Sequence, residues 1–175
     1  MASEDVLERV TSMEMCGETE NIAIRRLSEE DYSVYYEMNY SRSLFQKLFH
    51  DEFMQKIWER ANAEDILVYT IIEKQTNEIC GFCQLEHVNT STPELGIDIR
   101  DGFMGRGYAQ EAIKLLISYA KNHFNVDYFI WKADKENLIS CHIVEKLGGQ
   151  LISEKPSLPE NVIEYGKEKG IITSN

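Results

Sequence analysis

The hydrophobic and polar positions change their period several times along the chain. Residues 21–27 read NIAIRRL and alternate apolar with other side chains, which predicts a first strand. Ser28 stands three residues before Asp31, the spacing of a capping box, and predicts the start of a helix. A second helix is expected over 43–61, where large apolar side chains recur near helical spacing. The first third of the chain therefore predicts one strand followed by two helices.

The middle of the chain has the composition of β-strands separated by turns. β-branched and aromatic residues fill 66–74, a polar turn follows, and apolar residues return over 79–88. This pattern predicts an antiparallel hairpin. Residues 92–99 read TPELGIDI and predict the next strand. The three strands together predict a meander.

The last third alternates between helical and strand patterns. Apolar side chains recur at helical spacing over 109–120 and predict an amphipathic helix. Residues 126–131 predict a strand, 137–149 a helix stopped by glycine, and 150–153 a short strand. The predicted order is β-α-α-β-β-β-α-β-α-β, which indicates an α/β class with a mixed sheet of the α+β kind.

Length and composition are those of a single globular domain. The chain has 175 residues, 43% of them hydrophobic and 27% charged. We expect a loose or helical N-terminal arm over 1–20, a folded domain over 21–154 and a C-terminal tail over 155–175 that packs on it. The apolar runs are too short to cross a bilayer and the acidic start is not a secretion signal, so no membrane contact and a cytoplasmic location are expected.

The net charge of −12 bears on which classes of ligand the protein can bind. General nucleic-acid binding needs a basic surface, so no nucleic-acid partner is expected. A negative field attracts cationic small molecules or basic peptide segments, although many soluble proteins are acidic for solubility alone.

Cys80 and Cys83 form a C-x-x-C pair close to His87, which raises the alternative of redox or zinc chemistry. The pair lies in a strand pattern, in which residues three apart point to opposite faces. No second C-x-x-C or H-x-x-x-H pattern completes a zinc set. We therefore expect no metal site.

Residues 101–112 read DGFMGRGYAQEA and place three glycines directly before the amphipathic helix. A P-loop would need lysine and serine or threonine after Gly107, where Tyr108 and Ala109 stand. A dinucleotide fingerprint would need a third glycine at Gln110. The backbone N–H groups of such a loop can nevertheless hold a diphosphate at the positive end of a helix, where a β-carbon would obstruct the approach.

The segment MGRGYA, 104–109, resembles the pyrophosphate-binding loop of the GNAT superfamily of acyl-CoA N-acyltransferases, whose pattern is Gln/Arg-x-x-Gly-x-Gly/Ala. The segment NLISCHIVEKLGG, 137–149, resembles the family's second motif and is most similar to the branch of ribosomal-protein N-terminal acetyltransferases. The resemblance covers roughly 22–154 in element order. It implies a fold in which two central parallel strands splay apart and the acyl-pantetheine lies between them.

The resemblance also implies an activity. The expected enzyme transfers an acetyl group from acetyl-CoA to a primary amine by direct attack in a ternary complex, with a peptide N-terminus, a polyamine or another cationic small molecule as acceptor. A homodimer is left open. Met104 replaces the usual Gln or Arg, and Val144 stands where many members carry a tyrosine that protonates the leaving thiolate. These departures favour the alternative of a non-catalytic acyl-CoA-binding module that acts as a sensor or interaction partner.

Acyl transfer needs a base for the amine, a donor for the oxyanion and a proton for the thiolate. By the resemblance, Glu94 is expected as the base acting through water, with Asp98 as runner-up. A backbone N–H of strand 95–99 is the expected oxyanion donor. Ser140 is expected to protonate the thiolate or contact CoA, and Tyr165 is a remote alternative acid. The expected CoA-binding residues are Ile97, Asp98, Ile99, Met104, Gly105, Arg106, Gly107, Tyr108, Ala109, Asn137 and Ser140.

Several of these residues have plain structural alternatives. Glu94 fits a solvated acid at a strand end equally well. Asn137 fits a helix cap and Ser140 an ordinary hydroxyl in the first turn. The aromatic side chains over 32–53 either line an acceptor pocket or pack the two helices.

Overall fold

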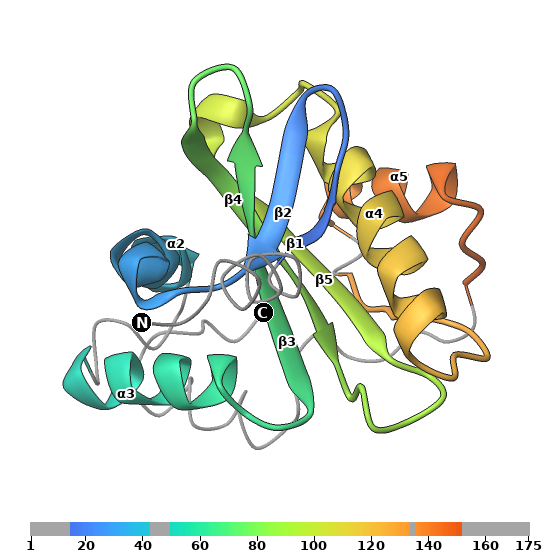
Figure 1. Ribbon diagram of the computed structural model, residues 1–175, viewed down its shortest axis with the longest axis horizontal. Coiled ribbons are helices and arrows are strands. Elements are labelled where there is room, and N and C mark those ends of the chain that lie inside the picture. The colour runs from blue at the N-terminus through green and yellow to red at the C-terminus, as the bar shows by residue number, and fades with distance from the viewer. Residues whose placement is uncertain (1–14, 43–49, 134–135, 152–175) are drawn as a thin grey trace, which may run out of the picture. The chain divides into compact units, whose positions relative to one another are not determined.

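The computed structural model describes residues 15–42, 50–133 and 136–151 (Figure 1). The chain divides into two compact units, Met1–Lys132 and Ala133–Asn175. None of the helices in the described ranges is long and apolar enough to cross a membrane. The described elements form a mixed α/β fold, which confirms the predicted class.

The first unit is built on a six-stranded sheet whose strands lie in chain order, β1-β2-β3-β4-β5-β6. The strands are β1 Met15–Glu18, β2 Ile22–Arg26, β3 Ile66–Glu73, β4 Glu78–Glu86, β5 Glu94–Ile99 and β6 Ile130–Trp131. Neighbours from β1 to β5 pair antiparallel, and β6 pairs parallel to β5. The predicted hairpin of β3 and β4 and the meander through β5 are therefore confirmed.

Helices cover both faces of this sheet (Figure 1). They are α2 Tyr32–Arg42, α3 His50–Ala61 and α4 Tyr108–His123. The neighbouring strand residues Val68 and Tyr69 show the two layers. Val68 packs in a cluster with side chains of α2 and α3, and the ring of Tyr69 lies 5.7 Å from that of Tyr119 on α4.

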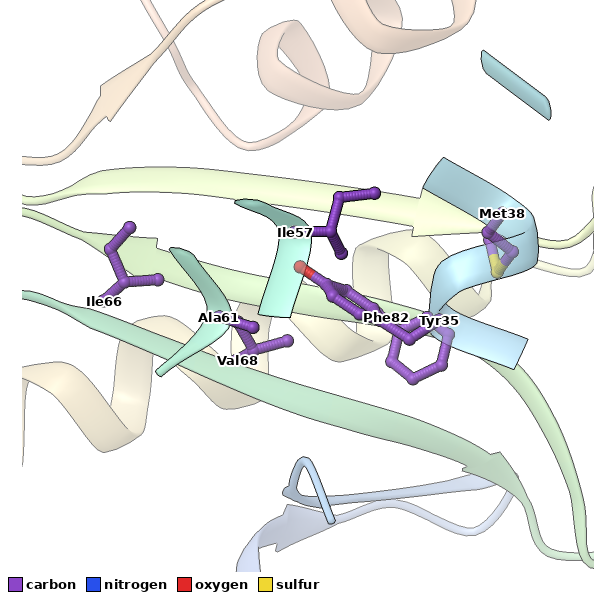
Figure 2. Close-up of a cluster of buried hydrophobic side chains, with 7 residues drawn as sticks. All are labelled: Tyr35, Met38, Ile57, Ala61, Ile66, Val68 and Phe82. Atoms are coloured by element: carbon purple, nitrogen blue, oxygen red, sulfur yellow. The ribbon is translucent and has the colours of Figure 1, made fainter. Parts of the chain in front are cut away.

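The layer under α2 and α3 has an apolar core, which Figure 2 shows in close-up. Its buried members are Tyr35, Met38, Ile57, Ala61, Ile66, Val68 and Phe82. The rings of Tyr35 and Phe82 meet edge to face at 5.0 Å. Burial of each large apolar side chain stabilises a fold by about 1.5–3 kcal/mol. Tyr35 therefore follows the helix-packing alternative given for the early aromatic residues.

The N-terminal segment differs from the prediction at Met15–Glu18, which is a strand and neither loose nor helical. It pairs with β2 through a bulge between Met15 and Gly17. A β-carbon on Gly17 would lie 3.1 Å from Leu115 of α4, so the strand runs close under this helix. Four residues are too few to show a period, and the partner strand supplies the hydrogen bonds that make them a strand.

The bounds of other helices and strands also differ from the predicted ones. The predicted helix over 43–61 is described from His50, and 43–49 lie outside the described residues. The strand expected over 126–131 is only Ile130–Trp131. Residues 150 and 151 of the expected last strand are not in a strand, while 152–153 and the tail 155–175 with Tyr165 lie outside the described residues.

The second unit contains α5, Leu138–Lys146. Asn137 caps it, because its Oδ1 accepts a hydrogen bond from the backbone N–H of Ser140 at 3.1 Å. The helix ends at a left-handed Gly148, with φ of 84°, and the N–H of Gly149 donates to the carbonyl of Val144 at 2.8 Å. These are the cap and stop that the sequence predicts.

Candidate functional site

Strands β5 and β6 pair over two residues only. Their pairing comprises Glu94 with Ile130 and Leu95 with Trp131. β6 ends at Trp131, whereas β5 runs on to Ile99. The pairing of these two parallel strands is therefore limited to Glu94 and Leu95 of β5, and the expected splay of the strands stays a prediction.

The glycine loop follows β5 directly and leads into α4. After a short turn at Asp101–Phe103, Gly105 and Gly107 adopt φ of 76° and 81°. Residues other than glycine rarely adopt such values. A β-carbon at Gly105 or Gly107 would contact no other atom of the described chain within 4 Å. The backbone conformation is therefore what requires glycine here within the chain.

The loop gathers several N–H groups at the start of α4. Gly107 is the N-terminal cap of this helix, and its carbonyl accepts from the N–H of Glu111 at 3.2 Å. The first N–H groups of an α-helix have no partner within the helix. Among the described residues, the N–H groups of Gly105, Arg106 and Gly107 donate to no backbone carbonyl either. Together with the helix dipole, this arrangement can hold an anionic group.

A buried carboxylate, that of Glu73, contacts two side chains of the loop region. Oε1 of Glu73, at the end of β3, lies 2.6 Å from Nη1 of Arg106 and accepts from the hydroxyl of Tyr108 at 2.6 Å. Oε2 accepts from the hydroxyl of Thr76 at 2.6 Å. The Glu73 side chain is 2% exposed. Hydrogen bonds from Thr76 and Tyr108, followed by the charge of Arg106, hold the pKa of Glu73 below its usual value.

Glu73 is a site residue that the sequence reasoning missed. The sequence feature that could have identified it is a carboxylate two and four residues after Ile71 and Tyr69 in the same strand, on the face that these two buried side chains share. Arg106 was expected to contact phosphate, and the structure pairs its guanidinium with Glu73.

The face of β5 turned toward α2 and α3 carries the acidic candidates. Glu94 lies at the start of β5, where it pairs with Ile130 of β6, with its Oε2 2.6 Å from Nζ of Lys132 and its side chain 16% exposed. Asp98 lies further along the same face, because strand residues alternate between faces. Glu86 is the cross-strand partner of Glu94 and pairs with Arg60 at 2.7 Å. The two candidate bases thus share one face of the strand that leads into the glycine loop.

The CoA-binding candidates fall into two groups. Residues 97–99 and 104–109 belong to the first unit, where β5, the loop and α4 follow one another along the chain. Asn137 and Ser140 belong to the second unit. Their described contact is the cap of α5, so their place at the site stays a prediction.

The C-x-x-C pair lies in the sheet and is buried. A bulge in β4 interrupts the alternation, since Ile71 pairs with Gly81 and Ile72 with Ile79. The argument that residues three apart face opposite ways is therefore wrong here. Burial raises the pKa of the Cys80 thiol to about 12, and it raises that of Cys83 well above its ordinary value. Such thiols stay protonated, which opposes redox or metal chemistry. No group of three metal-ligating side chains lies together in the described part of the chain.

Solved structures resemble this chain in fold. The spermidine N-acetyltransferase from Vibrio cholerae in complex with CoA and spermine has a TM-score of 0.63 at 20% identity, covering 78% of this chain and 87% of that one. A domain from Methanocaldococcus jannaschii has a TM-score of 0.63 at 18% identity, covering 78% and 92%. At these identities the likeness extends to the fold alone.

Sequence comparison gives a more specific result. A stretch of 85 residues is 32% identical to "Uncharacterized N-acetyltransferase p20" of Bacillus licheniformis and covers 47% of each protein. The match thus spans about half the length of that relative. The model of the acetyltransferase (GNAT) domain matches residues 21–150, which include β2 to β6, the glycine loop and α5. With most of its length matched by this model, the chain belongs to the GNAT acetyltransferase domain family.

Proposed function

We propose that the protein transfers an acetyl group from acetyl-CoA to a primary amine by direct attack in a ternary complex. The observation that carries this proposal is the left-handed glycine loop that joins the end of β5 to the start of α4. Family membership is its second support. The CoA complex of the Vibrio cholerae neighbour agrees with acetyl-CoA as the co-substrate.

In this proposal each part of the site has a separate task. The N–H groups of the loop over 105–109 bind the diphosphate of CoA, because several donors and the helix dipole converge there. The backbone of 97–99 holds the pantetheine arm, and one of its N–H groups stabilises the oxyanion. Asn137 and Ser140 contribute from the second motif, with Ser140 protonating the thiolate or contacting CoA.

The acceptor amine must lose a proton, because a lysine-like amine has a pKa of about 10.4. We assign this step to Glu94 acting through water, with Asp98 as the second candidate. Glu94 is the first residue of β5, pairs with Ile130 of β6 and lies beside the ammonium group of Lys132. A site that holds a lysine ammonium at 2.6 Å suits a cationic acceptor.

Charge and neighbours favour the same acceptor class. The chain has a net charge of −12, and Glu86, Glu94 and Asp98 lie on one face of two paired strands. The neighbour from Vibrio cholerae is a spermidine N-acetyltransferase. We therefore propose a polyamine or a peptide N-terminus, the latter from the similarity of the second motif to the ribosomal-protein branch.

The alternative is an acyl-CoA-binding module without turnover. The side chain of Met104 is 46% exposed in the loop, where many family members carry a polar side chain. Val144 lies in α5 at the place of the family's tyrosine. Val144 has no hydroxyl to protonate the CoA thiolate, and Met104 has no polar group to contact the phosphate. These two departures from the family pattern are the support for a module without turnover.

Ligand binding and product formation separate the two proposals. Thermal unfolding is followed with acetyl-CoA, CoA, ATP and NADH, and free thiol is then followed with acetyl-CoA and a panel of polyamines and peptides. A ligand at about 100 times its Kd stabilises the fold by about 2.7 kcal/mol. We expect stabilisation by both CoA species and thiol release with at least one amine. Stabilisation by neither CoA species contradicts both proposals, and stabilisation without thiol release supports the binding module.

The base is tested by Glu94→Gln, with Lys132→Ala as the companion variant because it removes the ion pair and keeps the carboxylate. We expect kcat to fall about 100-fold in Glu94→Gln, in the range typical for a lost general base, with the Kd for CoA unchanged. A kcat equal to that of the wild type removes Glu94 from this role.

A further inference from the structure

We propose that Glu73 is a positioning residue, whose carboxylate fixes the glycine loop in its diphosphate-binding conformation by holding Arg106 and Tyr108. This inference rests on the proposed function, since it assumes that the loop binds CoA. Glu73 itself touches no part of the ligand in this proposal.

The geometry places both anchors on one oxygen. Arg106 and Tyr108 stand on either side of Gly107, and both reach Oε1 of Glu73 at 2.6 Å. Glu73 is the last residue of β3, so the loop is tied to a central strand of the sheet. Two contacts across a left-handed glycine restrict the rotation of its backbone on both sides.

The carboxylate is itself held in place. Its second oxygen accepts from the hydroxyl of Thr76 in the turn between β3 and β4. The N–H of Asn77 donates to the carbonyl of Glu73 at 2.9 Å, which closes the same turn. Both oxygens therefore have fixed partners, and the loop is held by a group that cannot easily move with it.

Arg106 is held by more than one contact. Its Nη2 donates to the carbonyl of Gly102 at 3.1 Å, and its guanidinium lies 5.2 Å from the centre of the Phe103 ring. The positive charge is thus directed at Glu73 and at the start of the loop. It follows that the backbone N–H groups, and not this side chain, supply most of the diphosphate contacts.

An energetic reason follows from the glycines. A loop with Gly105 and Gly107 has many accessible conformations, and ordering it on ligand binding costs entropy. Contacts that order the loop beforehand reduce this cost. The lowered pKa of Glu73 keeps the carboxylate ionised at neutral pH, so both contacts are present under ordinary conditions.

The test compares Glu73→Gln with the matched control Glu78→Gln. Glu78 is the cross-strand partner of Glu73, is exposed and loses the same charge. The Kd for CoA is measured by calorimetry, and kcat/KM is measured with acetyl-CoA and with S-acetylpantetheine, which lacks the diphosphate. We expect Glu73→Gln to raise the Kd for CoA about tenfold, as for a lost hydrogen bond to a charged group. We expect kcat/KM for acetyl-CoA to fall by the same factor. The kcat at saturation and kcat/KM for S-acetylpantetheine should stay within about twofold, as should every value for Glu78→Gln.

The outcomes distinguish the two proposals. If the wild type binds no CoA, the proposed function fails and this inference fails with it. If the wild type binds CoA and Glu73→Gln binds it equally tightly, only this inference is overturned. Tighter binding by Glu73→Gln overturns it as well, because Arg106 then binds CoA better once it is released from Glu73. Equal losses with both acetyl donors also overturn it, since they indicate a general structural effect. Should Glu73→Gln not fold, Tyr108→Phe removes one donor to the same oxygen and is judged by the same measurements.

Discussion

Asp31 and Glu73 are both 2% exposed carboxylates that accept from an arginine and a hydroxyl, but they lie on opposite faces of β3. Asp31 binds Arg25 through both oxygens, at 2.7 and 2.9 Å, and accepts from the hydroxyl of Thr70 at 2.7 Å. Glu73 binds Arg106 and Tyr108 of the glycine loop. The same chemistry thus occurs once under the helices α2 and α3 and once at the candidate site.

The difference lies in the elements that the partners belong to. Arg25 is in β2 and Thr70 is in β3, so Asp31 joins the start of α2 to two strands that are already paired. Burial raises the pKa of Asp31, but hydrogen bonds from Arg25, Thr70 and Ser28 outweigh it and hold the pKa below its ordinary value. The partners of Glu73 lie in a loop around a left-handed glycine. We expect the carboxylate bound to regular elements to stabilise the fold, and the one bound to the loop to order the proposed CoA-binding surface.

The largest effect that tests this comparison is expected from Asp31→Ala. Removing one member of a buried ion pair costs about 3–5 kcal/mol, and the partial exposure of Arg25 places the loss in the free energy of unfolding at the lower end, about 3 kcal/mol. Urea unfolding measures this loss. The control is Glu30→Ala in the same turn, which is exposed and should change little. A lower CoA affinity of the folded Asp31→Ala protein would break the separation between the two carboxylates.

The next effect is expected from Gly107→Val, which acts on the loop directly. Valine strongly disfavours φ near 81°, so the N–H groups turn away from the diphosphate. Loss of two hydrogen bonds to a charged group, at about 1.5 kcal/mol each, weakens CoA by about 100-fold. Calorimetry measures the affinity, and circular dichroism should show an intact fold. The control Gly102→Ala, whose φ is not positive, should bind CoA like the wild type. Unchanged affinity in Gly107→Val would contradict the assignment of the loop.

A smaller effect is expected from Tyr108→Phe, which removes one of the two loop donors to Glu73 and leaves the ring. A single lost hydrogen bond corresponds to a loss of CoA affinity of about threefold to tenfold. The melting temperature should stay close to that of the wild type. Tyr128→Phe removes a hydroxyl from an exposed side chain of the same unit and serves as the control. A large fall in stability with unchanged CoA affinity would show that Glu73 acts like Asp31.

The smallest effect is expected in the pH dependence of stability. The pKa of Asp31 is lowered by folding, so its contribution is complete above the unfolded value of about 3.9 and is lost as the pH falls toward the folded one. The free energy of unfolding of the wild type should therefore decrease below about pH 5, and that of Asp31→Asn should decrease less steeply. Urea unfolding between pH 7 and pH 3.5 measures both slopes. Equal slopes would remove Asp31 as a source of acid sensitivity.

Local patterns predicted the elements whose residues repeat. The apolar positions of α4, its start directly after Gly107 and the alternation of β5 are visible in the sequence, because each of these elements repeats its apolar side chains with its own period. Strand β3 is visible as a run of β-branched and aromatic residues, which are buried on both faces of the sheet. Strand β1 was missed, because four residues show no period. The bulge at Cys80 was missed as well, because it depends on how β4 pairs with β3.

By itself, the sequence determined the class of the fold, the order of its elements from β2 to α5, and a glycine loop that only a few residue types can form. These follow from side-chain period and from the conformational range of glycine, which are local properties. The tertiary structure alone decided that Arg106 and Tyr108 bind Glu73, more than 30 residues away. It also decided that β6 pairs with β5 only at Glu94 and Leu95. Both depend on which strands become neighbours, and no local pattern contains the partner of a side chain that is distant along the chain.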